Sequence, residues 1–324
     1  MKNLIIPRLY CPFPSKLNPH VEQIKKHTDE WVIKFGLCND MKNYYSDNYS
    51  YFTGRLYPNA PYDRLCIVND FFTLLFFIDD KLDSPLAKTA IEKEITVKEF
   101  VKRIMAVIKQ EKALEQKENN PIFAALEDVW RRLADRSDNV WLASFVKEIE
   151  YILEAALWEY KNSAGKEMPT IEEYLEKRRY AGAANIAISM IDFLEEKHLP
   201  AFLKEHTIVQ GLEKTACNII CISNDLFSLS KEDLFGDVHN LPSIIINERK
   251  ITSEQAVLLT AEIHDATVHQ FINLTQNLPS FDIETDEILL NYINILKTQI
   301  AGNVAWSELD TKRYKFGYSN LEIK

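Results

Sequence analysis

The sequence has 324 residues, of which 46% are hydrophobic and 11% aromatic, so the chain can bury a large core. Its net charge of -10 argues against a nucleic-acid partner, because contacts to a phosphate backbone need clustered Lys and Arg. The five scattered cysteines favour a reducing, cytoplasmic location, and the purest apolar run, residues 71–78, is far too short for the ~20 residues of a membrane span.

Apolar residues recur at helical spacing along most of the chain, and only eight glycines interrupt it. Neither a repeat nor a linker divides the sequence, so the pattern predicts an all-α fold in the form of a single-domain helical bundle over residues 1–324. We expect the Pro-rich residues 1–20 to form a strap over its body. The expected helices, in chain order, cover residues 61–80, 97–116, 121–135, 140–163, 171–193, 208–229, 253–277 and 286–307.

Three carboxylates mark the end of the first of these helices. Asp79, Asp80 and Asp83 follow an aromatic-rich segment directly. At about 100° per residue, Asp79 and Asp83 lie one turn apart on the same face, with Asp80 on its flank. Their oxygens can converge on a hard cation such as Mg²⁺, although a solvated acidic helix end explains a single motif of this kind equally well.

A second polar pattern lies near the end of the helix expected over residues 208–229. Asn224, Ser228 and Glu232 recur at intervals of four residues, so they share one face of a helix. An amide oxygen, a hydroxyl and a carboxylate suit a Mg²⁺ ion that also binds phosphate oxygens, and Lys231 adds a cation beside them. A polar helix face before a loop is the alternative, and the presence of the first motif argues against it.

Together the two patterns resemble the aspartate-rich and Asn/Ser/Glu metal motifs of microbial class I terpene synthases. Near the end of the chain, Arg313 and Tyr314 follow Trp306 and resemble the family's closing Arg-Tyr pair and the aromatic helix before it. The resemblance covers roughly residues 60–316, with the motifs in the family's order.

A further segment resembles the one that supplies the family's diphosphate-sensing arginine. Here Arg178 precedes a helix-breaking glycine, Gly182, by four residues. Ala181 departs from the family pattern, in which a polar residue often stands before this glycine and helps to couple the arginine to the helix break.

The resemblance implies the class I terpenoid synthase fold with a central active-site cavity. It also implies Mg²⁺-dependent ionisation of a linear prenyl diphosphate, followed by cyclisation of the carbocation to a terpene hydrocarbon or alcohol. Three Mg²⁺ ions would be held with the diphosphate by Asp79, Asp83, Asn224, Ser228 and Glu232. Hydrogen bonds to the diphosphate would come from Arg178, Lys231, Arg313 and Tyr314.

Helical geometry also indicates walls for a hydrocarbon pocket, because residues three, four and seven positions before a ligand share its face. Ordinary core packing is the alternative for each of them. The wall residues expected in this way are Phe72, Leu75, Phe76, Cys217, Ile220, Cys221 and Trp306.

Several alternatives stay open. Farnesyl diphosphate is the preferred substrate, and a diterpene cyclase that uses geranylgeranyl diphosphate is the first alternative. A chain-elongating prenyl transferase and a non-catalytic helical binding protein are more distant. A metal phosphohydrolase centred on His264 and Asp265 rests on one pair of residues only. A homodimer is one option for the assembly. Residues 233–240 and the C-terminal segment near Tyr314 are expected to close over the bound ligand.

Overall fold

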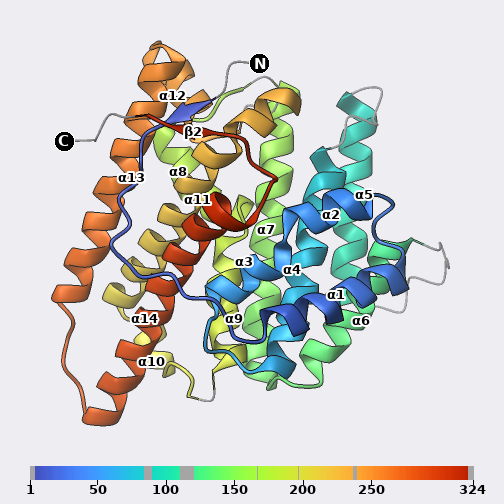
Figure 1. Ribbon diagram of the computed structural model, residues 1–324, viewed down its shortest axis with the longest axis vertical. Coiled ribbons are helices and arrows are strands. Elements are labelled where there is room, and N and C mark those ends of the chain that lie inside the picture. Colours follow the sequence, from blue (N-terminus) through green and yellow to red (C-terminus); the bar gives the residue numbers. More distant parts are fainter. Residues whose placement is uncertain are drawn as a thin grey trace.

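The computed structural model describes residues 4–83, 90–109, 120–165, 167–195, 197–235 and 239–319, and leaves the side chains of residues 82–83, 90–96, 163–165 and 233–235 outside the description. Its helices are α1 (Val21–Phe35), α2 (Met41–Asp47), α3 (Tyr49–Leu56), α4 (Tyr62–Asp83), α5 (Ala90–Ile108), α6 (Pro121–Ala134), α7 (Asn139–Gly165), α8 (Ile171–Ala181), α9 (Ala184–Leu194), α10 (Ala201–Lys204), α11 (Thr207–Phe235), α12 (Leu241–Arg249), α13 (Ser253–Gln276) and α14 (Ile283–Ala305). A π-helical turn (Trp306–Asp310) continues α14, and the short strands are β1 (Ile5–Ile6) and β2 (Gly317–Tyr318). The predicted all-α fold is confirmed, since long helices pack together as a bundle (Figure 1). Within the described ranges, no helix combines the length and the apolar character needed to cross a membrane.

Apolar periodicity predicts the positions of α4, α6, α7, α11, α13 and α14 to within a few residues at most of their ends, and it misses other features. The helices α1, α2, α3 and α10 were not expected, and the helix expected over residues 97–116 is α5, which begins at Ala90. The single helix expected over residues 171–193 is divided into α8 and α9 at Gly182 and Ala183. The helix α12 was not expected, because Pro242 stands inside it. The proline is tolerated in the first turn, where its missing N–H would have no helical partner, and Asn240 caps the helix by accepting from the backbone of its first turn.

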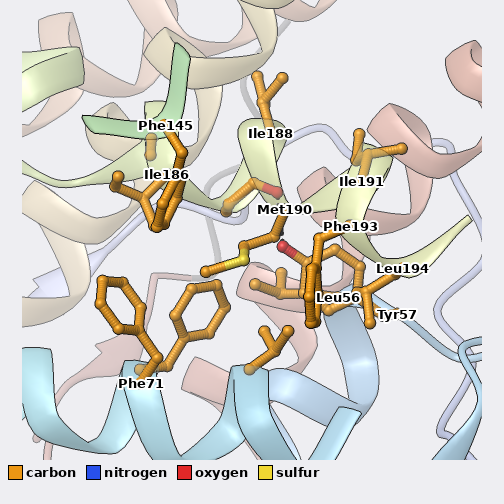
Figure 2. Close-up of a cluster of buried hydrophobic side chains, with 14 of the residues drawn as sticks. Leu56, Tyr57, Phe71, Phe145, Ile186, Ile188, Met190, Ile191, Phe193 and Leu194 are labelled. Carbon is orange, nitrogen blue, oxygen red and sulfur yellow. Dashed lines mark hydrogen bonds between the residues drawn. The ribbon is translucent and has the colours of Figure 1, made fainter. Parts of the chain in front are cut away.

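An apolar core fixes α4 against α7 and α9. Figure 2 shows the side chain of Met190 reaching from α9 toward Phe71 on α4. The ring of Phe71 lies 5.6 Å from that of Phe145 on α7, and all three side chains are buried. Full burial of each of these side chains stabilises the folded protein by about 1.5–3 kcal/mol. The contacts therefore set the position of α4 and of the carboxylates at its end.

A buried carboxylate further fixes α4 to α1 and α6. Asp70 is fully buried and accepts from Thr28 Oγ1 at 2.6 Å, and its other oxygen lies 2.8 Å from an Arg132 nitrogen and 3.0 Å from His27 Nε2. A buried charge is tolerated only with such partners, so α4 cannot slide along its neighbours without leaving Asp70 unpaired.

The two short strands, near the start and the end of the described chain, lie side by side (Figure 1). β1 and β2 pair in parallel, with Ile5 opposite Gly317 and Ile6 opposite Tyr318. Ile6 is fully buried in a small apolar cluster with residues of α11, α13 and α14. The N-terminal segment therefore lies directly against the chain that follows Arg313 and Tyr314.

Candidate active site

Two cations hold the carboxylate of Asp80 near the end of α4. Arg313 donates to it from both terminal nitrogens, at 3.0 Å to Oδ2 and 2.5 Å to Oδ1, and Lys231 donates to Oδ1 at 3.0 Å. Burial raises the pKa of Asp80, but the hydrogen bonds and charges of Arg313 and Lys231 outweigh it and hold this pKa below its ordinary value. Asp80 is therefore ionised at neutral pH, and it links α4 to α11 and to the segment after α14.

Asp79 is placed differently from its neighbour, because successive helix residues are turned by about 100°. Its side chain is 60% exposed, and its Oδ2 lies 3.7 Å from the nearest Arg313 nitrogen. The carboxylate is thus open to a ligand on the side where the cations gather. The role predicted for Asp83 falls on a side chain outside the described residues, although its backbone ends α4.

Asn224, Ser228 and Glu232 lie within α11 at the predicted spacing. Ser228 Oγ is 2.6 Å from Glu232 Oε1 and 2.7 Å from the carbonyl oxygen of Asn224. Glu232 Oε2 accepts from Asn240 Nδ2 at 2.9 Å. Among the side chains that the structure describes, no group of three or more His, Cys, Asp and Glu could hold a metal ion. The amide, hydroxyl and carboxylate oxygens of Asn224, Ser228 and Glu232 are hard donors that suit a divalent cation such as Mg²⁺.

The amide of Asn224 is held from both sides. A terminal nitrogen of Arg178 donates to its Oδ1 at 3.2 Å, and its Nδ2 donates to the hydroxyl of Tyr314 at 3.0 Å. Burial raises the pKa of Tyr314, so this hydroxyl remains protonated. Residues predicted to bind diphosphate and metal therefore meet around one amide, from α8, α11 and the C-terminal segment.

The break between α8 and α9 lies where the sequence indicates a helix-breaking glycine. A Cβ on Gly182 would lie 2.8 Å from Cys221 Sγ, so a larger residue there would collide with α11. The residue in the left-handed region is Ala183, with φ of 53°, whereas Gly182 has φ of -83°. Close packing rather than an unusual backbone angle therefore requires the glycine.

Phe72, Phe76 and Trp306 gather in one aromatic group beside the acidic end of α4. The rings of Phe76 and Trp306 are 5.7 Å apart, and Phe52 lies between 4.9 and 6.0 Å from all three. Trp306 is 1% exposed and donates from its indole nitrogen to the carbonyl of Asn48 at 3.0 Å. Phe72 is also buried, whereas Phe76 is partly exposed. Phe76 is thus the ring best placed to face a ligand, and the predicted role of all three toward a carbocation stays a prediction.

The remaining expected wall residues divide by burial. Leu75 is partly exposed on α4, and Cys217, Ile220 and Cys221 are buried on α11. Their contact with a hydrocarbon stays a prediction.

Two residues at the site were not indicated by the sequence, because they lie in a region where no helix was expected. The hydroxyl of Tyr49 accepts from Arg313 at 3.0 Å and donates to Asp47 Oδ2 at 2.9 Å. Its ring also stacks on Phe76, with ring centres 4.2 Å apart. Tyr49 therefore supports both the arginine and the aromatic group.

His264 and Asp265 form a separate pair on α13. His264 is fully buried, and its Nδ1 lies 2.8 Å from Asp265 Oδ1, which also accepts from the backbone N–H of Tyr10 at 2.9 Å. The pair attaches the N-terminal segment to α13. Since no third metal-binding His, Cys, Asp or Glu joins it among the described side chains, it gives no support to a metal phosphohydrolase.

Sequence comparisons agree with this geometry. The family model described as terpene synthase family 2, C-terminal metal binding, matches residues 70–270. The chain is 31% identical to (+)-T-muurolol synthase ((2E,6E)-farnesyl diphosphate cyclizing) of Roseiflexus castenholzii, in a match that covers 98% of this chain and 96% of that protein. It is 28% identical to germacrene A synthase of Nostoc punctiforme, over 99% of this chain and 98% of that protein.

Solved structures share the fold. Germacradien-4-ol synthase of Streptomyces citricolor superposes with a TM-score of 0.79 at 22% identity, covering 92% of this chain and 97% of that one. Hedycaryol synthase superposes with a TM-score of 0.79 at 20% identity, in a match that covers 94% of this chain and 98% of that one. The family model extends over the end of α4, the helix break and the α11 motif, and the relatives match nearly the whole chain. The chain therefore belongs to the microbial class I terpene synthases, which are lyases that act on prenyl diphosphates.

Proposed function

We propose that the protein cyclises farnesyl diphosphate. The C–O bond to the diphosphate would break with release of diphosphate, and the resulting carbocation would cyclise. Loss of a proton would then give a sesquiterpene hydrocarbon, and capture of water with loss of a proton would give an alcohol. The observation that carries the proposal is the meeting of acidic and basic groups around Asp80 and Asn224, which brings Arg313 and Lys231 to the first and Arg178 to the second.

The substrate is inferred from the relatives. The name of the Roseiflexus castenholzii protein specifies (2E,6E)-farnesyl diphosphate, and other relatives are named sesquiterpene synthases. A geranylgeranyl diphosphate cyclase is the alternative for chain length. A chain-elongating prenyl transferase is less favoured, because Asn224, Ser228 and Glu232 stand where such enzymes carry a second aspartate-rich motif. We take residues 1–324 as one catalytic domain, since the relatives match nearly all of them.

The oxygen donors fit Mg²⁺, and three ions are expected with the diphosphate. Asp79 and Asp83 would hold them from α4, and Asn224, Ser228 and Glu232 from α11. When bound, Mg²⁺ supplies Lewis-acid stabilisation of the departing diphosphate. The fit is supported by the 60% exposure of the Asp79 side chain and by the 2.6 Å separation of the Ser228 and Glu232 oxygens.

The chain's own cations would bind the diphosphate. Arg178 and Arg313 present planar donor forks that match phosphate oxygens, Lys231 adds a point charge, and Tyr314 adds a neutral donor. Arg313 is 7% exposed and Arg178 is 12% exposed, so their charges act where water screens them weakly. An acidic protein can therefore bind an anionic substrate at this one place.

The aromatic group would protect the hydrocarbon part of the reaction. Rings around the acidic end of α4 would exclude water, and the face of Phe76 would stabilise positive charge through its quadrupole. Phe72 and Trp306 would shape the wall behind it, since both are buried.

The direct test is incubation of the protein with C10, C15 and C20 prenyl diphosphates and Mg²⁺, followed by gas chromatography with mass detection. We expect cyclic C15 products. Cyclic C20 products alone would favour the diterpene alternative, and longer prenyl diphosphates would identify a chain-elongating enzyme. No conversion of any substrate, with the protein shown to be folded, would reject the proposal.

A further inference from the structure

Asp225 adjoins Asn224 on α11 and is fully buried. Because it is turned by about 100° from Asn224, it lies off the stripe that carries the predicted metal ligands. Its Oδ1 accepts from Arg178, with Nε at 2.8 Å and a terminal nitrogen at 2.7 Å. Its Oδ2 accepts from the backbone N–H of Leu241 at 3.0 Å and lies 2.8 Å from the hydroxyl of Tyr174.

These contacts fix the orientation of the Arg178 guanidinium. The terminal nitrogen that faces Asp225 also donates to Asn224 Oδ1 at 3.2 Å. One edge of the planar fork is therefore held by two adjacent residues of α11, and a planar group held at two points on one edge cannot rotate freely.

The same carboxylate connects three helices. Tyr174 and Arg178 stand one turn apart on α8, and Leu241 is the first residue of α12. The residue before it, Asn240, donates to Glu232 Oε2 at 2.9 Å. The start of α12 is thus attached both to Asp225 and to a predicted metal ligand.

We propose that Asp225 is a positioning residue for diphosphate binding, an inference that rests on the proposed function. It holds the Arg178 fork against Asn224 before the substrate arrives, and it ties the fork to the start of α12. The diphosphate then meets an arginine whose position is already set, and the entropy of ordering a long side chain is not lost on binding. Asp225 binds neither substrate nor metal in this account.

The test measures binding of inorganic diphosphate in the presence of Mg²⁺ by isothermal titration calorimetry, beside thermal melts. Asp225→Asn keeps the shape of the side chain but removes its charge, and we expect the Kd for diphosphate to rise about tenfold or more, since a charge-assisted hydrogen bond is lost. Tyr174→Phe removes one neutral contact to the same carboxylate, and we expect its Kd to stay within about threefold of the wild-type value.

A matched control separates positioning from simple stabilisation. Asp70→Asn also removes the charge of a fully buried aspartate that pairs with an arginine, but Asp70 lies between α1, α4 and α6. Its hydrogen-bond and ion-pair partners among the described residues, Thr28, His27 and Arg132, are not residues of the site. We expect it to lower the melting temperature and leave the diphosphate Kd unchanged. If Asp225→Asn behaves in the same way as Asp70→Asn, Asp225 is structural only and the proposal is wrong.

A double-mutant cycle tests the route through Arg178. In an Arg178→Ala background, Asp225→Asn should weaken diphosphate binding no further, because the group that it positions is gone. Additive losses would overturn the proposal. If Asp225→Asn does not fold, Asp225→Glu carries the test, since it keeps the charge and shifts the oxygens by one methylene. Weaker binding then supports the positioning role, and wild-type affinity overturns it.

The outcomes for the two proposals differ. Unchanged diphosphate binding in a folded Asp225→Asn variant, beside a wild type that forms terpenes, overturns only the role of Asp225. Absence of Mg²⁺-dependent diphosphate binding by the wild type overturns both.

Discussion

Asp80 and Arg313 form a two-point ion pair, with both carboxylate oxygens accepting from the terminal nitrogens of the arginine at 3.0 and 2.5 Å. The pair joins the end of α4 to a segment more than 230 residues later in the chain. The two adjacent carboxylates, Asp79 and Asp80, therefore differ in their environment. Asp80 is occupied by protein cations, whereas the side chain of Asp79 is 60% exposed.

The first prediction compares these neighbours. Asp79→Asn should lower turnover about 100-fold or more with an unchanged melting temperature, because it removes an exposed ligand oxygen. Asp80→Asn should also lower the free energy of unfolding by about 1–2 kcal/mol. The loss is smaller than for a fully buried pair, since 38% of the Asp80 side chain is exposed. Steady-state rates and thermal melts check both variants, with Asp63→Asn at the exposed start of α4 as the control. Equal stability losses in Asp79→Asn and Asp80→Asn would refute the division.

The second prediction concerns the arginine fork. Arg313→Lys should reduce turnover by about tenfold or more, because lysine keeps the charge but cannot present two parallel donors. Arg55→Lys is the matched control, since Arg55 also pairs with an aspartate, Asp310. Its described polar partners, Asp310 and Ser15, are not among the residues predicted to bind metal or diphosphate. The control should lose stability and retain most of its activity. Comparable activity losses in both lysine variants would show that the Arg313 effect is not specific to the diphosphate.

The third prediction separates cation stabilisation from core packing. Phe76→Leu should keep measurable substrate consumption and shift the products toward acyclic or monocyclic terpenes. The loss of about 1.4 kcal/mol of stabilisation of one cyclisation transition state changes its rate relative to a competing route tenfold. Trp306→Leu should also lower the melting temperature, since its indole is buried and donates to Asn48. Phe71→Leu is the control, since Phe71 is buried in the core on α4, the helix that carries Phe76. It should lower the free energy of unfolding by about 1 kcal/mol and leave the product ratios unchanged. An unaltered product profile in Phe76→Leu would reject the role of the ring.

Periodicity and motif spacing were sufficient for much of this architecture. The stripe of apolar residues predicts α4 and α11, and four-residue spacing places Asn224, Ser228 and Glu232 along one helix. Both features depend on residues close together in the chain, so local rules reach them. The break at Gly182 was indicated only by the resemblance to the family, since apolar periodicity predicted one helix over residues 171–193.

Other features depend on contacts between distant segments. No glycine or proline marks the boundary between α2 and α3, which lies at Asn48 with φ of 58°. Tyr49 therefore could not be placed beside Arg313. The ion pairs of Asp80 with Lys231 and Arg313 likewise form only once α4, α11 and the C-terminal segment have packed together. The position of Tyr49 and the partners of Asp80 depend on packing between distant segments, which cannot be predicted from local patterns in a single sequence.

The fourth prediction uses a buried carboxylate on α11 that lies outside the motif. Burial raises the pKa of Glu213 to about 7 from its ordinary value of 4.5. The hydrogen bond from Tyr292 lowers it and the charges of Glu148 and Asp192 raise it, while Lys204 lowers it. Between these two pKa values the folded chain binds more protons than the unfolded chain, so stability falls as pH rises through this window. The total loss is about 3 kcal/mol.

The glutamine in a Glu213→Gln variant cannot ionise, so this variant should not lose stability in the same way as pH rises. Its free energy of unfolding relative to the wild type should therefore rise by about 2–3 kcal/mol between pH 5 and pH 8, as measured by urea denaturation. Glu172→Gln, at an exposed position on α8, is the control and should follow the wild type. Parallel pH dependence of Glu213→Gln and the wild type would contradict the assignment.

The most direct measurement of the central claim is the release of diphosphate from farnesyl diphosphate by the wild type and by Asn224→Ala, with and without Mg²⁺. Asn224 is the residue at which the predicted metal and diphosphate groups meet, through Arg178 and Tyr314. We expect release only with Mg²⁺, and a loss of about 100-fold or more in Asn224→Ala with an unchanged circular dichroism spectrum. Full release after exhaustive chelation, or wild-type release by the folded variant, would contradict the account.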